Sequence, residues 1–125
     1  MYELTVMDEF AAAHQLRNYG GDCERLHGHN WKVEVMVKAD ELDRLGMVID
    51  FRELKEAMGK VISYLDHQVL NHLPEFKDEN PTSENIARYI FKTLAGGFDR
   101  KRLKLHKVIV WETDSAWAGY AEDEI

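Results

Sequence analysis

The sequence predicts an α+β protein in which a four-stranded antiparallel sheet carries two helices on one face. Two observations support this fold class. Apolar residues alternate with polar ones in segments near both ends of the chain, which is the period-two pattern of strands. Between these segments, apolar residues recur every three or four positions, as in amphipathic helices. The predicted order is strand, strand, helix, helix, strand, strand, in a single domain spanning residues 1–125.

The first two strands are predicted at residues 2–14 and 27–39, with a loop of turn-forming residues between them. Each has one apolar face, formed by Tyr2, Leu4, Val6, Phe10 and Ala12 in the first strand and by Trp31, Val33, Val35, Val37 and Ala39 in the second. His14 is even-numbered like the apolar residues of the first strand, so it is predicted to lie on their face. Since side chains two positions apart share a face, His27 and His29 lie on the same side as the second row.

The first helix is predicted to begin after Asp50, because this residue can cap the first turn and Glu53 completes a capping-box pattern. It ends near residues 65–67, where an irregular stretch rich in Asn, Pro, Asp and Glu begins. The second helix begins after a cap at Thr82 or Ser83 and is expected to stop at Gly96-Gly97. Two further strands complete the prediction, at residues 105–113 and 116–122.

The third strand is apolar on both faces. Leu105, Ile109 and Trp111 have one parity, while Val108 and Val110 have the other. Helices that cover one side of the sheet leave its other side exposed, so this excess of apolar strand surface predicts burial by oligomerisation.

Composition and charge narrow the class of protein. A net charge of -7 argues against a nucleic-acid-binding protein, which normally presents a basic face. The N-terminus has neither the basic head nor the apolar run of a signal peptide, and no later stretch approaches membrane-spanning length. We therefore expect a cytoplasmic protein without a membrane or nucleic-acid partner. The single cysteine cannot form an internal disulfide.

Four metal-ligating or reactive side chains gather around the loop between the first two strands. Catalytic zinc sites commonly use three protein ligands and leave one position open, and His14, His27 and His29 supply that number. Cys23 either completes a closed structural site as fourth ligand or stands beside the metal as a base, since a nearby cation favours the thiolate. Both alternatives fit the residues.

Two further candidates lie outside this loop. Asp66 and His67 place a carboxylate and an imidazole at a helix end, where they either reach into a cleft or interact with the helix C-terminus. Glu112 follows a very apolar run of strand, so its carboxylate needs a partner. That partner is either a Lys or Arg, or a ligand edge rich in N–H groups such as that of a pterin.

Ordered motifs along nearly the whole chain resemble the 6-pyruvoyl-tetrahydropterin synthase family. They are Phe10-Ala-Ala-Ala-His14, Cys23-x-x-x-His27-Gly-His29, Asp50-Phe51-x-x-Leu54-Lys55, Leu65-Asp66-His67-x-x-Leu70-Asn71, Pro81-Thr82-Ser83-Glu84-Asn85 and Trp111-Glu112-Thr113. The resemblance implies a tunnelling fold, in which trimers close a barrel and two trimers stack as a homo-hexamer with active sites between subunits. The short chain is most similar to the 6-carboxy-5,6,7,8-tetrahydropterin synthase branch, which acts in queuosine biosynthesis.

Matching residues imply matching roles. The resemblance assigns Cys23 as the proton-abstracting base, with Asp66 and His67 as its relay, and it assigns the Zn²⁺ ligands as His14, His27 and His29. Glu112 corresponds to the residue that anchors the pterin ring. The same pocket is expected to be lined by Thr82, Ser83 and Glu84.

The activity implied is a lyase reaction on 7,8-dihydroneopterin triphosphate. Loss of triphosphate and a retro-aldol-like cleavage would release acetaldehyde and leave 6-carboxytetrahydropterin. The alternatives are the family's 6-pyruvoyl-tetrahydropterin synthase reaction, which keeps the side chain, a zinc hydrolase that uses metal-bound hydroxide, and a non-enzymatic module with a structural zinc site.

Overall fold

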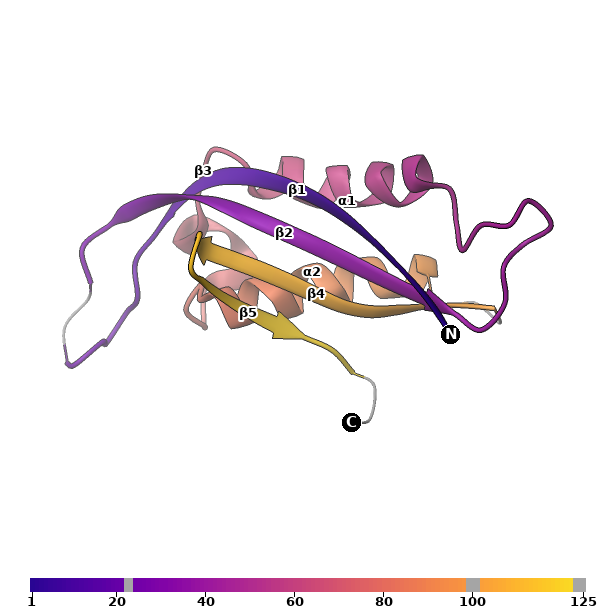
Figure 1. The fold of residues 1–125 in the computed structure, drawn as a ribbon. Helices are drawn as coiled ribbons and strands as arrows, with labels where there is room; N and C mark the ends of the chain where they lie inside the picture. Colours follow the sequence, from indigo (N-terminus) through magenta and orange to yellow (C-terminus); the bar gives the residue numbers. More distant parts are fainter. Residues whose placement is uncertain (22–23, 99–101, 123–125) are drawn as a thin grey trace.

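Two long antiparallel strands form the centre of the sheet (Figure 1). The computed structural model describes residues 1–21, 24–98 and 102–122. In it, β1 (Tyr2–His14) pairs with β2 (His27–Ala39) along their full lengths, without a register shift. β4 (Leu103–Thr113) then pairs with β2, and β5 (Ala116–Tyr120) pairs with β4. The alternation of apolar residues therefore predicted both long strands correctly.

The sheet has a fifth strand that the sequence did not predict. β3 (Gln68–Val69) pairs in parallel with Ala12 and Ala13, so the sheet is mixed and has the order β3-β1-β2-β4-β5. The prediction of four antiparallel strands was wrong in this respect, because two residues are too few to show a period. Two 3₁₀ turns follow, η1 (Leu70–His72) and η2 (Pro74–Phe76).

Two helices lie on one face of the sheet, as predicted (Figure 1). α1 (Phe51–Leu65) begins after Asp50, whose side chain accepts a hydrogen bond from the Arg52 amide at 2.8 Å. α2 (Ser83–Phe98) is capped by Thr82, whose hydroxyl accepts from the amide of Asn85. It does not stop at Gly96-Gly97 but continues to Phe98, whose side chain is buried in the core. None of the helices in the described residues is long and apolar enough to cross a membrane.

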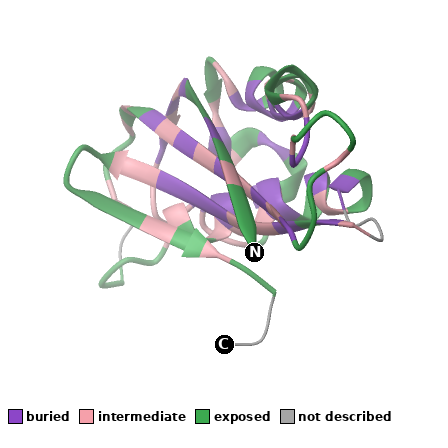
Figure 2. Cartoon of the chain, turned by 45° about the vertical axis from the view of Figure 1, so that its right-hand side comes forward, coloured by how far each residue is buried: buried purple, intermediate pink, exposed green. Residues whose placement is uncertain are grey.

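The core lies between this sheet face and the helices (Figure 2). Leu105 belongs to it together with Val108 and Val110, which corrects the predicted pairing of Leu105 with Ile109. The cause is a register shift against β2: Val37 pairs with Leu105 and Met36 with Lys107, which leaves one extra residue in β4. Such a bulge reverses the parity of the strand. The strand bounds also differ slightly, since β4 begins at Leu103 and β5 ends at Tyr120.

Candidate metal centre

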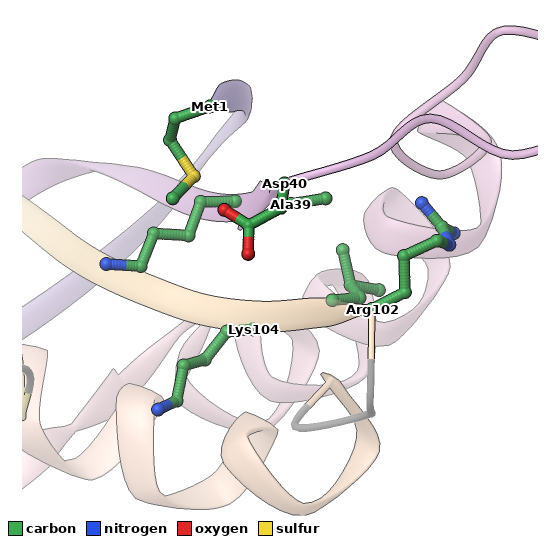
Figure 3. Close-up of a pocket in the computed structure, with 7 residues that line it drawn as sticks. Met1, Ala39, Asp40, Arg102 and Lys104 are labelled. Carbon is green, nitrogen blue, oxygen red and sulfur yellow. The ribbon is translucent and has the colours of Figure 1, made fainter.

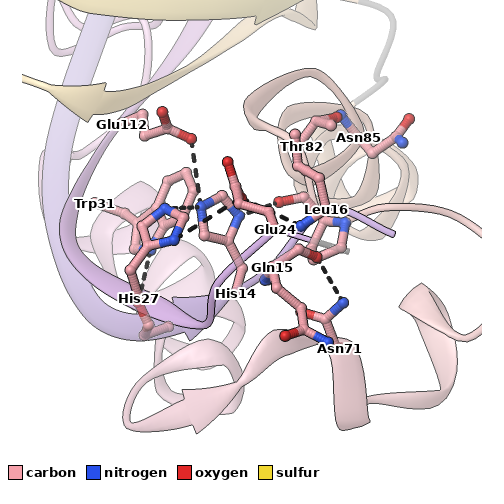
Figure 4. A network of polar contacts seen from close by, with 12 residues as sticks. His14, Gln15, Leu16, Glu24, His27, Trp31, Asn71, Thr82, Asn85 and Glu112 are labelled. Atoms are coloured by element: carbon pink, nitrogen blue, oxygen red, sulfur yellow. Dashed lines mark hydrogen bonds and ion pairs between the residues drawn. The ribbon is translucent and has the colours of Figure 1, made fainter. Parts of the chain in front are cut away.

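Strand pairing brings three imidazoles together at one end of the sheet. In the register of β1 and β2, His14 lies opposite His27 and Ala12 lies opposite His29. Each histidine offers one ligand nitrogen, and the three nitrogens lie within 4.8 Å of one another. His14 is almost fully buried, with 2% of its surface exposed. Figure 4 shows His14 and His27 of this cluster and the polar contacts around them.

Main-chain carbonyls determine the tautomers of two of these rings. Nδ1 of His14 lies 2.8 Å from the carbonyl oxygen of Pro81, and Nδ1 of His27 lies 2.8 Å from that of Arg25. Because a carbonyl oxygen only accepts, each Nδ1 carries the proton and each neutral ring presents a lone pair at Nε2. The two Nε2 atoms are 3.1 Å apart. Zn–N bonds of about 2.0–2.1 Å in tetrahedral geometry put ligand nitrogens at about 3.3 Å, so a cation fits between these lone pairs.

The third ring has a buried nitrogen without a hydrogen bond. Among the described residues, Nε2 of His29 finds no partner. Burial lowers the pKa of His29, and the neighbouring rings of His14 and His27 lower it further, while Glu112 opposes them. The neutral form that metal ligation requires is therefore favoured. Three imidazole nitrogens that lie within 4.8 Å of one another fit a zinc ion.

A carboxylate completes the surroundings of these rings. Oε1 of Glu112 lies 3.6 Å from Nε2 of His14 (Figure 4). The pairing of β4 with β5 shifts between Trp111 and Thr113, so Glu112 is the extra residue of a bulge. Bulges occur next to active sites because they redirect a side chain. Among the described residues, the basic side chain near this carboxylate is thus a histidine, and not the Lys or Arg considered above.

Asp66 and His67 form a pair of their own. Nδ1–H of His67 donates to Oδ2 of Asp66 at 2.8 Å, while Oδ1 of Asp66 accepts from the amide of Ala11. The Ala11 amide, followed by His67, lowers the pKa of Asp66. His67 has a φ of +57°, in the left-handed region that glycine prefers. The backbone amide of Asp66 also caps α1 at the Ile62 carbonyl.

The pair is not part of the histidine cluster within one chain. The His67 side chain is 81% exposed, and no hydrogen bond or ion pair in the described part of the chain joins either residue to the three imidazoles. Thr82 uses its hydroxyl to cap α2, Ser83 is half-buried, and Glu84 is exposed in the first turn. Cys23 lies outside the described residues.

Sequence reasoning missed several groups that support the rings. The carbonyls of Pro81 and Arg25 are main-chain atoms, so no side-chain pattern marks them. Trp31 was assigned only to the core, yet its ring lies 4.8 Å from that of His14 and 5.1 Å from that of His29, nearly perpendicular to both. Its indole N–H donates to the carbonyl of Ala12 at 3.1 Å. The shared strand face of His27, His29 and Trp31 was the signal in the sequence that could have indicated this contact.

A cavity of about 210 Å³ lies at the other end of the sheet, where β1 begins and β2 ends (Figure 3). Two of its cationic side chains, Arg102 and Lys104, point apart. The guanidinium of Arg102 donates to the carbonyls of Glu41 and Val48, and Lys104 extends away from Arg102. Within residues 1–21, 24–98 and 102–122, the three histidines are the group of side chains that could hold a metal ion.

Comparison with known proteins places this chain in a family. The family model described as 6-pyruvoyl tetrahydropterin synthase matches residues 3–123. A 6-carboxy-5,6,7,8-tetrahydropterin synthase of Synechocystis sp. is 40% identical over 116 residues, covering 89% of this chain and 86% of the relative. The 6-pyruvoyl tetrahydrobiopterin synthase of Dictyostelium discoideum is 32% identical, with 94% and 93% covered.

The fold leads to the same family. The structure of Caenorhabditis elegans 6-pyruvoyl tetrahydropterin synthase superposes with a TM-score of 0.82 at 29% identity, covering 98% of this chain and 96% of that one. The structural neighbours thus share the tunnelling fold that the motifs predicted. The chain is therefore an enzyme of the 6-pyruvoyl tetrahydropterin synthase family.

Proposed function

We propose that this chain is a zinc-dependent lyase that converts 7,8-dihydroneopterin triphosphate to 6-carboxy-5,6,7,8-tetrahydropterin, releasing acetaldehyde and triphosphate. The observation that carries the proposal is the convergence of three histidine nitrogens, one of them buried without a hydrogen bond. The choice of product follows the name of the Synechocystis relative, which is 40% identical. We place the reaction in queuosine biosynthesis and in the cytoplasm.

The residues of the chain hold the reactants in this proposal. His14, His27 and His29 bind Zn²⁺, which when bound supplies Lewis acidity to the hydroxyl groups of the substrate side chain. Glu112 accepts hydrogen bonds from the N–H edge of the pterin, for which a carboxylate is the matching acceptor. The pocket beside it is lined by Thr82, Ser83 and Glu84.

Proton transfer falls to the remaining predicted residues. Cys23 is the proposed base, His67 exchanges protons with it, and Asp66 holds the tautomer of His67 through the 2.8 Å hydrogen bond at Nδ1. Because His67 forms no hydrogen bond or ion pair with the cluster among the described residues, the proposal draws this pair from a neighbouring subunit of a homo-hexamer. Such assembly would bury exposed apolar residues of the sheet, including Trp117, Met7 and Tyr2.

A product assay tests the reaction. The purified zinc-loaded protein is incubated with 7,8-dihydroneopterin triphosphate, and the pterin product is identified by mass spectrometry while acetaldehyde and triphosphate are quantified. We expect 6-carboxytetrahydropterin with equal amounts of acetaldehyde and triphosphate. The metal-depleted protein is the control and should form neither product. A pyruvoyl product without acetaldehyde would refute the proposed reaction.

The second candidate is 6-pyruvoyl-tetrahydropterin synthase activity, which the names of the Dictyostelium and Caenorhabditis proteins favour. The same assay separates the two, because only the carboxy reaction releases acetaldehyde. Chelation separates both from a purely structural zinc module. A catalytic site loses activity while the fold remains, whereas removal of a structural zinc ion unfolds the domain. Phosphate or ester hydrolysis with full turnover in Cys23→Ala would instead support a zinc hydrolase.

A further inference from the structure

Two side-chain amides hold the segment that follows His14. The side chain of Asn71 accepts a hydrogen bond from the backbone N–H of Gln15 at 2.9 Å and donates one to the backbone carbonyl of Gln15 at 2.8 Å. The side chain of Asn80 likewise accepts from the backbone N–H of Arg17 at 2.7 Å and donates to the backbone carbonyl of Arg17 at 3.2 Å. Each amide satisfies both the N–H and the C=O group of one residue, as a neighbouring strand does in a sheet.

The side chain of Arg17 strengthens this arrangement from the opposite direction. Its guanidinium donates to the carbonyls of Phe76 at 2.6 Å, Glu79 at 3.1 Å and Asn71 at 3.2 Å. Hydrogen bonds from a charged donor are stronger than those between neutral groups. The segment from residue 71 to residue 80 is therefore held against residues 15–17 by contacts in both directions.

The hydrogen bond that orients His14 joins its ring to the Pro81 carbonyl, and each amide binds or belongs to a residue next to one of these two partners. Gln15, which Asn71 holds, directly follows His14 in the chain. Asn80 directly precedes Pro81, whose carbonyl lies 2.8 Å from Nδ1 of His14. The carbonyl of Asn80 itself accepts from the side chain of Asn85 at 2.8 Å. Figure 4 shows Asn71, Gln15 and His14 in sequence along this network.

We propose that Asn71 and Asn80 are positioning residues of the metal centre, which hold the His14 ring and the Pro81 carbonyl together so that Nε2 faces the other two imidazoles. This inference rests on the proposed function, since it requires that the three histidines bind a metal ion. The hydrogen bonds of the two amides go to the main chain of Gln15 and Arg17, and among the described residues none goes to an imidazole. Loss of a group that orients a ligand typically weakens metal affinity by about 10–100-fold.

Nearly isosteric substitutions test this role. Asn71→Asp and Asn80→Asp keep the size of the side chain and one acceptor, but they put a carboxylate oxygen against the carbonyl of Gln15 or Arg17. Co²⁺ is titrated into the metal-free full-length protein, and its Kd is measured by competition with a chelator. Visible absorption of the Co²⁺ complex is recorded as well. We expect both variants to bind Co²⁺ about 10–100-fold more weakly, with an altered spectrum.

Asp43→Ala is the matched control. Asp43 also binds main-chain groups through its side chain, accepting from the amides of Leu45 at 2.9 Å and Met47 at 3.0 Å, but in the connection before α1. This control should lose stability and keep its Co²⁺ affinity. If an Asp variant does not fold, Asn71→Ala and Asn80→Ala provide the same test without the added charge.

The outcomes separate this inference from the proposed function. Wild-type Co²⁺ affinity and spectrum in folded Asn71 and Asn80 variants would overturn the positioning role alone. An equal loss of affinity in Asp43→Ala would also overturn it, because the effect would then be general destabilisation. If the wild-type protein bound Co²⁺ no more tightly than His14→Ala, both the metal centre and the inference would fail.

Discussion

Replacing His29 by leucine should change stability in opposite directions with and without metal. In the metal-free protein, the buried Nε2 of His29 has no hydrogen-bond partner among the described residues. Such a group carries its desolvation penalty without compensation. Leucine removes this polar atom while it keeps an apolar side chain beside Trp31, whose ring lies 5.1 Å from that of His29. His29→Leu should therefore stabilise the metal-free protein and remove a metal ligand.

The expected magnitudes follow from these contacts. An unsatisfied buried polar atom costs about 1–3 kcal/mol, and for a domain of this size 1 kcal/mol shifts Tm by roughly 4 °C. We expect Tm in the presence of chelator to rise by about 4–12 °C. Free Zn²⁺ at about 1,000 times its Kd stabilises the wild-type protein by about 4 kcal/mol. His29→Leu should gain little from zinc, so the wild-type protein becomes the more stable of the two.

Thermal unfolding followed by circular dichroism, with chelator and with excess Zn²⁺, measures both effects. His72→Leu is the control, because His72 is exposed in η1 and should leave both melting temperatures nearly unchanged. A clear loss of metal-free stability in His29→Leu would show that the Nε2 atom of His29 has a stabilising partner. An undiminished response to Zn²⁺ would show that His29 is not a ligand.

Three other substitutions have defined outcomes. The Ala11 amide lowers the pKa of Asp66, so this carboxylate stabilises the fold fully above its ordinary pKa of 3.8 and loses that effect as pH falls through its lower folded pKa. In Asp66→Asn, the free energy of unfolding measured in urea should therefore fall less steeply with decreasing pH below about pH 4. The same steepness as in the wild-type protein would contradict this. Cys23→Ala should reduce turnover by about 10²–10⁴-fold with zinc affinity kept, as steady-state kinetics and chelator competition will measure, whereas full turnover would exclude the proposed base. Trp31→Phe leaves the buried Ala12 carbonyl without its indole donor and should cost about 1–3 kcal/mol in urea unfolding; a neutral effect would count against that hydrogen bond.

Local periodicity predicted most of the fold, and pairing between distant segments explains what it missed. The alternation in residues 2–14 and 27–39 yields both long strands because each has one buried face. Leu105 was placed on the wrong face, since a bulge appears only once β4 is aligned with β2. β3 exists because Ala12 and Ala13 offer a free edge to a two-residue segment. Such an edge depends on tertiary structure and has no signal in the sequence of residues 68–69.

The candidate site shows the same division. The three histidines could be found because strand parity assigns side chains to a face. The approach of Glu112 to His14 was not predicted, since it depends on how β4 lies across β2. The carbonyl of Pro81 could not be identified either, because a main-chain atom looks the same in every residue. Sequence patterns thus identified ligand types, while the groups that orient them needed the structure.

The left-handed backbone of His67 has a consequence for anyone who engineers this enzyme for heat resistance. A residue other than glycine in this region of φ costs roughly 1–2 kcal/mol, so glycine at position 67, where φ is +57°, would be an obvious stabilising choice. It would also delete the ring that binds Asp66 at 2.8 Å. Backbone preference alone would select glycine at this position, whereas the hydrogen bond to Asp66 requires histidine. Position 67 should therefore be left unchanged when the enzyme is stabilised.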